Sequence, residues 1–470
     1  MNRDFAVATS GKRVAIIGGG VAGSTVALYL AQKGLIVSLF EKNANLVSGP
    51  PICHLHAGGN LYRELSQQQC TDLLHQSIEF VNFFPSTINK RPTVIAVPQH
   101  DSGSPKALLP RLELLRESYH ALVARDAKNA VLGNPEDYFH GFDYHQLKEL
   151  AKRQAPKKPE SIEDWLIPFA KHTDLEKLKY PVYVVQEYGL SLFRVAASVE
   201  LAAQQLDNLA IYTGQPVKSV KRRENGFTLA LSGGRAEDFD YVINACGFRT
   251  GTIDDQLHFS RQRMVEFKAA YVTKWTAHQT EKWPEVIFHG QRGTPQGMAQ
   301  LTPYPNGFFQ LHGMTNEITL FNQGLVRSSA DSAQPRLPTK LANKIDKGWS
   351  VEVQTQRSNR AIEHLSQYIP AFCSAEPAGT PLYGAQQIPG DDPSLRAADV
   401  SFEGENYARL EIVKASSALL AAKNINHAWF GLDGEGDGND SWGQSAESIE
   451  KRARQIALER GYPEALAIAY

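Results

Sequence analysis

The strongest constraint on the fold of this chain is a glycine-rich turn near its N-terminus. Gly18, Gly20 and Gly23 form the pattern Gly-x-Gly-x-x-Gly. An apolar run at 13–17 precedes the turn, and a segment with apolar residues at helical spacing follows it. Gly18 permits a tight turn, Gly20 lets a pyrophosphate approach the backbone, and Gly23 permits close packing of helix on strand. The turn therefore predicts a strand–helix unit that binds a dinucleotide.

The residues around this turn support that prediction. The amides of Val21 and Ala22 open the helix, where the helix dipole favours a negative charge. Glu41 ends the second apolar run, at 35–40, where its carboxylate can accept hydrogen bonds from ribose hydroxyls and repel a 2′-phosphate. Lys42 follows it directly. The alternative is that the glycines form only a turn, but strand, motif, helix, second strand and Glu41 all agree with a nucleotide site.

Length and composition restrict the class of protein. The 470 residues predict two or three structural lobes. With 49 basic and 50 acidic residues, the formal charge is −1, so nucleic acid is not expected as a partner. The four cysteines show no paired spacing, which favours a reducing compartment. No signal peptide and no long apolar span are recognisable, so we expect a cytoplasmic protein.

The pattern of apolar runs predicts a discontinuous nucleotide-binding domain. We assign 11–85, 190–258 and 395–470 to it, and 86–189 and 259–394 to an inserted substrate domain. The fold class expected is α/β, with a Rossmann-type domain and an inserted α+β domain built on an antiparallel sheet. Asn225-Gly226 predicts a hairpin. Near the C-terminus we expect a helix over 407–422, a strand over 427–430 and a glycine-rich loop that leads into a final helix.

Several short segments carry a family resemblance. The N-terminal fingerprint, the segment 52–59, the strand end 242–247 and the glycine-rich loop 431–443 together resemble the D-amino-acid oxidase-like superfamily of FAD enzymes. This superfamily includes the 2-hydroxyglutarate, malate:quinone and glycerol-phosphate dehydrogenases. His56-Ala57-Gly58 looks most like the segment that runs beside the flavin ring in the 2-hydroxy-acid members. The resemblance implies that FAD is the cofactor.

Motif and resemblance together define the candidate cofactor-binding residues. They are Gly18, Gly20, Val21, Ala22, Gly23, Glu41, Lys42, His56, Ala57, Gly58, Val217, Ala245, Gly247, Gly434, Gly436 and Gly438. Val217 resembles the position whose backbone meets the adenine, although it is equally consistent with a core valine. The last three glycines could bring backbone amides to a flavin carbonyl, or they could form a flexible surface loop.

Oxidation of a substrate carbon by a flavin requires a base and a clamp for the substrate. The resemblance places His56 near the flavin as a candidate base; a flavin contact or a covalent flavin attachment are the alternatives. His312 is a second candidate, for which a structural role competes. Arg263 and Tyr304, and less specifically Arg249 and Arg396, could hold a carboxylate. Cys53, His54 and His56 lack a second half with ligand spacing, so no metal site is predicted there.

These features predict an FAD-dependent dehydrogenase or oxidase. It would remove a hydride from a small hydroxy or amino acid and pass electrons to quinone, oxygen or another acceptor. One alternative is a flavin monooxygenase or halogenase that consumes NAD(P)H; another is a flavin-bound assembly factor without turnover. The basic and apolar C-terminal segment could touch a membrane surface, but an ordinary docked terminus is favoured. Substrate, acceptor, oligomeric state and mode of FAD attachment stay open.

Overall fold

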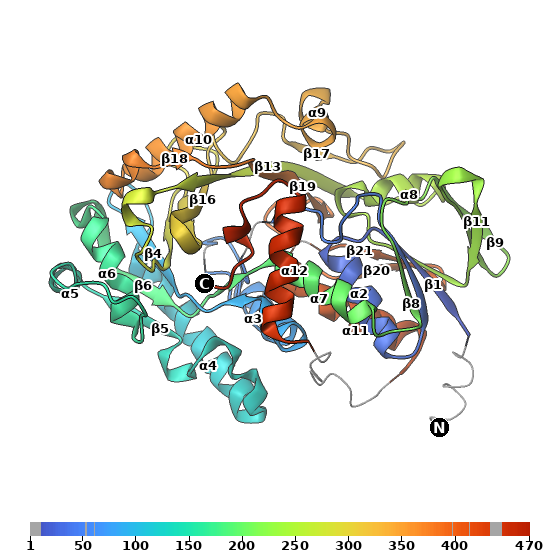
Figure 1. Ribbon diagram of the computed structural model, residues 1–470, viewed down its shortest axis with the longest axis horizontal. Helices are drawn as coiled ribbons and strands as arrows, with labels where there is room; N and C mark the ends of the chain where they lie inside the picture. Colours follow the sequence, from blue (N-terminus) through green and yellow to red (C-terminus); the bar gives the residue numbers. More distant parts are fainter. Residues whose placement is uncertain (1–10, 52–53, 61, 397, 413, 433–443) are drawn as a thin grey trace.

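The computed structural model describes residues 11–51, 54–60, 62–396, 398–412, 414–432 and 444–470. Its backbone is organised around a six-stranded sheet and a ten-stranded sheet (Figure 1). The chain builds part of the first sheet, leaves for the second, and returns to the first twice. Two sheets that share one chain in this way bring loops from distant parts of the sequence together between them.

The six-stranded sheet contains the predicted strand–helix–strand unit. Its strands are β1 (Arg13–Ile17), β2 (Ile36–Phe40), β8 (Leu209–Tyr212), β12 (Tyr241–Asn244), β20 (Val400–Glu403) and β21 (Tyr407–Leu410), in the order β20-β21-β12-β1-β2-β8. All neighbours run parallel except β20 and β21. Val14, Ala15 and Ile16 are completely buried, as expected for an apolar run covered on both faces.

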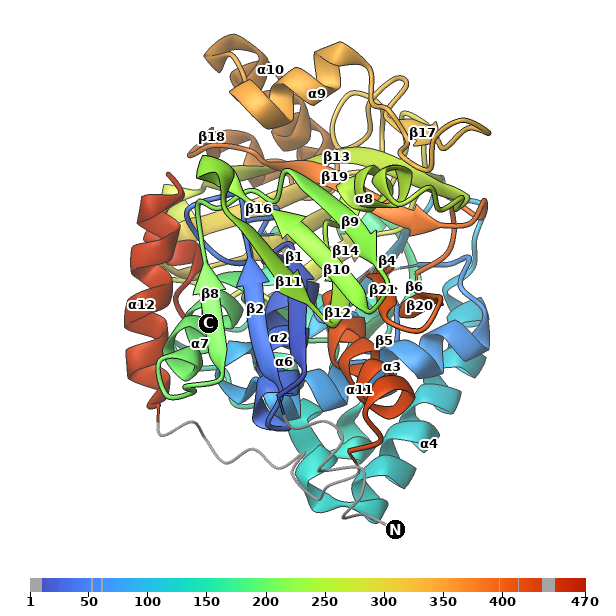
Figure 2. The same cartoon turned by 90° about the vertical axis from the view of Figure 1, so that its right-hand side faces the viewer.

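The two faces of this sheet are covered differently. Helices lie on one face: α2 (Val21–Gln32), α7 (Leu192–Ala203), α11 (Ala418–Trp429) and α12 (Ala446–Glu459). A small antiparallel sheet of β9 (Ser219–Arg223), β10 (Gly226–Ala230) and β11 (Ala236–Phe239) lies across the other face, beside α8 (Thr250–Gln256) (Figure 2). β9 and β10 form the predicted Asn225-Gly226 hairpin.

The ten-stranded sheet carries the second core. Its strands are β4 (Thr93–Pro98), β5 (Phe139–Phe142), β6 (Leu178–Val185), β13 (Arg263–Lys274), β14 (Glu285–Phe288), β15 (Ala299–Pro303), β16 (Phe308–Gly313), β17 (Leu325–Arg327), β18 (Glu376–Pro377) and β19 (Leu382–Pro389). The sheet is antiparallel except for the pair β14–β4. Apolar side chains on one face pack against α6 (Ile162–His172) and α10 (Val351–Ser366). This arrangement confirms the predicted fold class.

Four further helices belong to the described part of the chain. They are α3 (Gln67–Phe83), α4 (Leu109–Arg125), α5 (Tyr144–Leu150) and α9 (Thr339–Lys347). A two-stranded pair, β3 (Ile88–Asn89) with β7 (Gly189–Leu190), joins the segments that lead from one sheet to the other. Within the part of the chain that the structure describes, no helix has both the length and the apolar character that crossing a membrane requires.

The C-terminal prediction was wrong in its order of elements. Residues 407–410 form strand β21 instead of a helix, because they pair in parallel with β12 at the centre of the sheet. Residues 427–429 close helix α11 instead of forming a strand. Gly431 adopts a φ of +57°, and its N–H bonds back to Asn426, so this glycine ends a helix. The final helix begins at Ala446.

Candidate active site

Four chain segments meet at one edge of the six-stranded sheet. They are the turns and loops that follow the carboxyl ends of the parallel strands β1, β2, β12 and β21, and they begin at Gly18, Glu41, Ala245 and Glu411. In open α/β sheets this edge is where ligands bind. Topology therefore brings the predicted cofactor residues Gly18, Glu41 and Ala245 to one edge of the sheet.

The glycine-rich turn has the shape that a pyrophosphate requires. Gly18 has a φ of +106°, and a Cβ on it would lie 2.4 Å from the carbonyl oxygen of Ala245. A Cβ on Gly23 would lie 1.9 Å from the carbonyl oxygen of Gly18, so helix α2 packs directly on the turn. A Cβ on Gly20 would meet no protein atom within 4 Å. The first and third glycines are thus required by the fold, whereas the second leaves its space open to a ligand.

Glu41 is fixed at the end of β2. It is 5% exposed, and its carboxylate accepts hydrogen bonds from the backbone N–H groups of Gly19 (2.7 Å) and Asn43 (2.8 Å). These bonds orient the carboxylate and leave lone pairs that a ribose could use. Burial, followed by the charge of Arg249, lowers the pKa of the adjacent Lys42. The turn, the open space at Gly20 and the oriented carboxylate fit the adenosine diphosphate half of FAD.

Two further cofactor candidates flank this region. Ala245 is buried below the glycine-rich turn, and Gly247 has a φ of +58°, a left-handed conformation that favours glycine. Val217 lies in the segment before β9 and packs against the core of the small sheet. The neighbouring Lys218 donates its N–H to the carbonyl of Ala230. Val217 therefore makes the contacts expected of a core valine.

A polar face of the ten-stranded sheet is turned toward the nucleotide side. Strand register places Gln300 opposite His312 and Thr302 opposite Gln310, and Glu285 contacts both Gln300 and Thr302. All five side chains are less than 9% exposed. Buried side-chain atoms without a recorded partner include Nε2 of Gln310 and Nε2 of His312. Because buried polar atoms are usually paired, this face is suited to a polar ligand.

The segment from His54 to Asn60 crosses in front of that face. His56 has a φ of +60° and Gly58 of +108°; a Cβ on Gly58 would lie 2.6 Å from the hydroxyl of Tyr138. That hydroxyl donates to the carbonyl of Ala57 at 3.0 Å. This backbone conformation directs the imidazole of His56 toward His54, and the centroids of the two rings lie 5.3 Å apart.

His56 belongs to a group of aromatic and cationic side chains. Its ring stacks on Tyr62 with centroids 5.7 Å apart, and its Nε2 lies 3.3 Å from Nζ of Lys414. Nζ also donates to the hydroxyl of Tyr62, and the guanidinium of Arg396 lies 5.0 Å from the centre of the same ring. Burial, and then the charge of Lys414, lowers the pKa of His56 well below its ordinary value. The imidazole is therefore neutral at pH 7.

A buried carboxylate fixes the neighbouring His54. The carboxylate of Glu285 forms ion pairs with Nδ1 of His54 (2.7 Å) and with Nη1 of Arg91 (2.9 Å). Burial alone would raise the pKa of Glu285, but His54 and Arg91 outweigh it and hold the pKa at about 2. Glu285 thus connects the loop after β2, which carries His54, to the ten-stranded sheet, where Glu285 begins β14 and Arg91 lies just before β4.

Glu187 is a second buried carboxyl group at this site, with the opposite character. It accepts a hydrogen bond from the backbone N–H of Asn60 at 3.0 Å, and its other oxygen has no recorded partner. Burial raises its pKa to about 8, so Glu187 is mostly protonated at pH 7. Two carboxyl groups near the same loop therefore hold different protonation states.

The structure brings together only some of the predicted catalytic residues. His312 lies on the polar face, 6.0 Å from His54 between ring centres, and burial lowers its pKa to about 3. Tyr304 lies at the edge of that face and donates to Gln310 at 3.1 Å. Arg263 instead bonds Asp254 at 2.6 Å, in a buried group with Arg409. The geometry assigns Arg263 to a structural ion pair.

The other two candidates for holding a substrate carboxylate, Arg249 and Arg396, differ in their surroundings. Arg249 pairs with Asp346 at 2.8 Å on the surface. Arg396 joins the His56 group through the ring of Tyr62, as described above. Gly434, Gly436 and Gly438 lie outside the described residues. The element that follows the last parallel strand is the segment from Glu411 to Ser417, which leads into α11 and carries Lys414.

Several site residues were missed from the sequence. Lys414 was hidden by the incorrect helix over 407–422, and Glu187 and Glu285 lie in strand or strand-end segments without a motif. The sequence signal that could have revealed these residues is a charged residue within an apolar run. Lys268 on β13 is another residue that was missed from the sequence. Burial lowers its pKa to about 8, and its Nζ contacts Glu266 at 2.8 Å.

Fold and site together define a dinucleotide-dependent oxidoreductase. The model of the FAD dependent oxidoreductase family matches residues 13–408. The chain belongs to this FAD-dependent oxidoreductase family, and its cofactor is FAD. No curated protein matches the sequence.

Solved structures share the fold at low sequence identity. Glycine oxidase from Geobacillus kaustophilus is 12% identical, with 89% of this chain and 94% of that chain covered and a TM-score of 0.55. L-amino acid deaminase from Proteus vulgaris is 13% identical, with 93% and 96% covered and a TM-score of 0.57. L-α-glycerophosphate oxidase from Mycoplasma pneumoniae, solved with FAD bound, is 13% identical, with 92% and 97% covered and a TM-score of 0.55.

Proposed function

We propose that this enzyme oxidises a small hydroxy or amino acid at its α-carbon and passes the electrons to quinone or oxygen. The observation that carries the proposal is the group formed by His56, Tyr62, Lys414 and Arg396. It combines a neutral imidazole with the side chains of Lys414 and Arg396 at the ligand edge of the nucleotide-binding sheet. Solved structures with this fold include enzymes named for amino acids and for glycerophosphate.

His56 is the proposed base. Its Nε2 faces Lys414 and its Nδ1 has no recorded partner. The lowered pKa keeps the imidazole unprotonated at pH 7, so it can accept the hydroxyl or ammonium-derived proton of the substrate. The positive backbone φ and the stacking on Tyr62 hold the ring in one orientation. A fixed neutral imidazole is suited to removing one proton without reorganising.

Lys414 and Arg396 form the proposed clamp for the substrate carboxylate. Nζ of Lys414 lies 4.7 Å from the centre of the Tyr62 ring, and the guanidinium of Arg396 lies 5.0 Å from it. Burial, and then the charge of Arg396, lowers the pKa of Lys414 well below its ordinary value. An anionic ligand between these side chains would stabilise both charges. This favours an acid over a neutral alcohol as substrate.

The chemistry of the reaction is then divided between cofactor and protein. Bound FAD supplies the acceptor for the hydride that leaves the α-carbon. His56 takes the proton from the substrate oxygen or nitrogen, so that a carbon–oxygen or carbon–nitrogen double bond forms. The Lys414 and Arg396 side chains orient the carboxylate, and the buried polar face excludes bulk water. His54, held by Glu285, positions the neighbouring segment.

The proposal is tested by anaerobic mixing of the purified holoenzyme with a panel of 2-hydroxy acids and L- and D-amino acids. At least one acid should bleach the flavin absorption band, and its methyl ester, which lacks the carboxylate, should not. Bleaching by NADPH alone would support a monooxygenase instead. If neither an acid nor NADPH bleaches the band, the proposed oxidation is wrong. Adding oxygen or a soluble quinone to the reduced enzyme then identifies the acceptor.

A further inference from the structure

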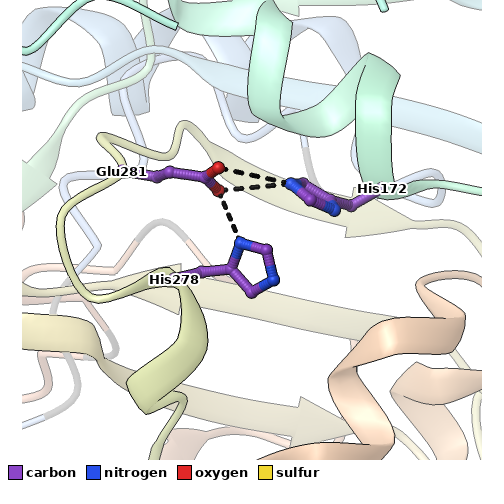
Figure 3. A group of neighbouring side chains, drawn as sticks. All are labelled: His172, His278 and Glu281. Atoms are coloured by element: carbon purple, nitrogen blue, oxygen red, sulfur yellow. Dashed lines mark hydrogen bonds and ion pairs between the residues drawn. The ribbon is translucent and has the colours of Figure 1, made fainter.

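Three potential metal ligands converge at a place that the proposed reaction does not use. His172 is the last residue of α6, His278 lies in the short 3₁₀ turn η8 (Thr276–His278), and Glu281 follows three residues later. Figure 3 shows the three side chains pointing toward one another, His172 from the helix and the other two from the segment after β13. Among the described residues, this is the one group of histidine, cysteine and acidic side chains with the spacing of a metal site.

The separations of the donor atoms fit a tetrahedral ion. Nδ1 of His278 lies 3.1 Å from Oε2 of Glu281, and Nε2 of His172 lies 3.3 Å from the same oxygen. All three donor atoms lie within 4.8 Å of one another. Zinc–nitrogen and zinc–oxygen bonds of about 2.0–2.2 Å place neighbouring ligands of a tetrahedron roughly 3.3–3.5 Å apart. The two pairs that involve Glu281 therefore need to lengthen by at most a few tenths of an ångström to accommodate the ion.

Aromatic packing holds the two imidazoles in place. The ring of His172 stacks on Trp283 with centroids 5.6 Å apart, and the ring of His278 lies 4.1 Å from that of Trp275. Trp275 and Trp283 are completely buried. The side chains of His172 and His278 remain 14% and 20% exposed, so an ion can reach them from solvent. The ligands are thus supported by the core but open on one side.

Metal binding requires neutral imidazoles and an ionised carboxylate. The remaining alternative is a carboxylate that only accepts hydrogen bonds from two imidazoles. Direct metal binding distinguishes the two.

We propose that His172, His278 and Glu281 form a zinc site that ties the C-terminal end of α6 to the segment after β13, with water as the fourth ligand. The two segments come from distant parts of the sequence, so the ion would cross-link them in the folded state only. The role is structural, because these residues belong to none of the contacts made by His56, Lys414 or the polar face. The proposal does not depend on the identity of the substrate.

The test uses full-length holoenzyme dialysed against a chelator and then titrated with Zn²⁺ in the presence of a chromophoric chelator. Bound zinc is measured by elemental analysis, and the melting temperature is measured with and without the ion. The wild type should bind one zinc per chain and melt at a higher temperature when loaded. His278→Ala and Glu281→Gln should each weaken binding by at least about tenfold and lose the rise in melting temperature.

His140→Ala is the matched control. His140 makes an exposed pair with Asp137 at 3.5 Å and belongs to no group of three ligands among the described residues. This variant should bind zinc like the wild type. His172→Ala provides a second test if His278→Ala fails to fold. Failure of the wild type to bind zinc, or equal binding by wild type, His278→Ala and Glu281→Gln, would overturn the proposal in favour of the hydrogen-bonded carboxylate.

Discussion

His56 is the residue on which backbone conformation, burial and charge act together. Its φ of +60° is unfavourable for a side chain with a Cβ, at a cost of about 1–3 kcal/mol. The surrounding structure maintains that conformation, and it also keeps the imidazole neutral through burial and Lys414. A strained residue with a shifted pKa at a ligand edge is typical of a functional position.

The first prediction concerns the proposed base. His56→Gln should lower the rate of anaerobic flavin reduction by about 10²–10⁴-fold without loss of bound FAD. Because the pKa of His56 lies well below 6.5, the neutral form persists as the pH falls, so the wild-type rate should show no inflection near 6.5. Stopped-flow absorption measures both effects. His120→Gln, at an exposed pair with Glu136, is the control. A rate equal to the wild type in His56→Gln would exclude the base role.

Glu187 gives a prediction about stability. Its pKa is raised from 4.5 to about 8, so its contribution to stability is fully present below pH 4.5 and is lost as the pH rises through 8. The wild type should therefore lose about 1–3 kcal/mol of unfolding free energy from this group between pH 5.5 and 9. Glu187→Gln cannot ionise and should reduce that loss. Urea unfolding at both pH values measures the difference; an unchanged pH dependence would contradict the assignment.

At the scale of elements, two glycines of the same turn have different roles: Gly23 is required for folding, whereas Gly20 is expected to matter for cofactor binding. Gly23→Ala places a Cβ 1.9 Å from a backbone oxygen and must displace α2, so we expect a fall in melting temperature. Gly20→Ala meets no protein atom within 4 Å, so it should melt like the wild type when both lack FAD. It should nevertheless bind FAD at least about tenfold more weakly, because the methyl group occupies the approach of the pyrophosphate.

Calorimetric melting and FAD titration check this pair of variants. Equal FAD affinity in Gly20→Ala and wild type would show that the pyrophosphate does not approach this glycine. Undiminished stability of Gly23→Ala would show that the close packing of α2 on the turn is incorrect. The two glycines are matched in chemistry and lie three residues apart, so the comparison isolates their positions.

The elements also show where sequence reasoning succeeds. The unit β1–α2–β2 and the β9–β10 hairpin were predicted correctly, because local patterns determine them: apolar runs, three glycines and an Asn-Gly turn. The segment 407–410 was not, because its strand forms by pairing with β12, which is more than 160 residues distant, as Asn244 and Arg409 in register show. That error concealed Lys414, which follows β21.

At the scale of the whole molecule, the site depends on contacts between two sheets. The glycine-rich turn and the position of Glu41 could be predicted, since both follow one motif. The substrate half could not: Glu285, Gln300 and His312 lie on three strands, and only cross-strand register aligns them. Arg263 was predicted to bind the substrate carboxylate from its residue type alone, whereas in the folded chain it forms an ion pair with Asp254. The domain boundaries given above stay a prediction.

Glu285 pairs with both His54 and Arg91, and Arg91 is 0% exposed. We therefore expect Glu285 to contribute strongly to the stability of the whole molecule. Glu285→Gln leaves that guanidinium buried without its counter-charge and should lower the unfolding free energy by about 3–5 kcal/mol. With a pKa of about 2, the carboxylate stabilises the fold above pH 4.5, and this contribution is lost as the pH falls toward 2. Urea unfolding at pH 7 and pH 3 tests this; a loss below about 1 kcal/mol at pH 7 would contradict it.

The absorption spectrum of the purified chain, recorded before and after acid precipitation, tests the central claim most directly. We expect a yellow protein with one FAD per chain, and the spectrum of the supernatant reports whether the flavin is covalently attached. Gly20→Ala, prepared in parallel, should contain less flavin. A colourless wild-type protein that takes up no FAD on reconstitution would contradict the nucleotide site, and with it the proposed oxidation.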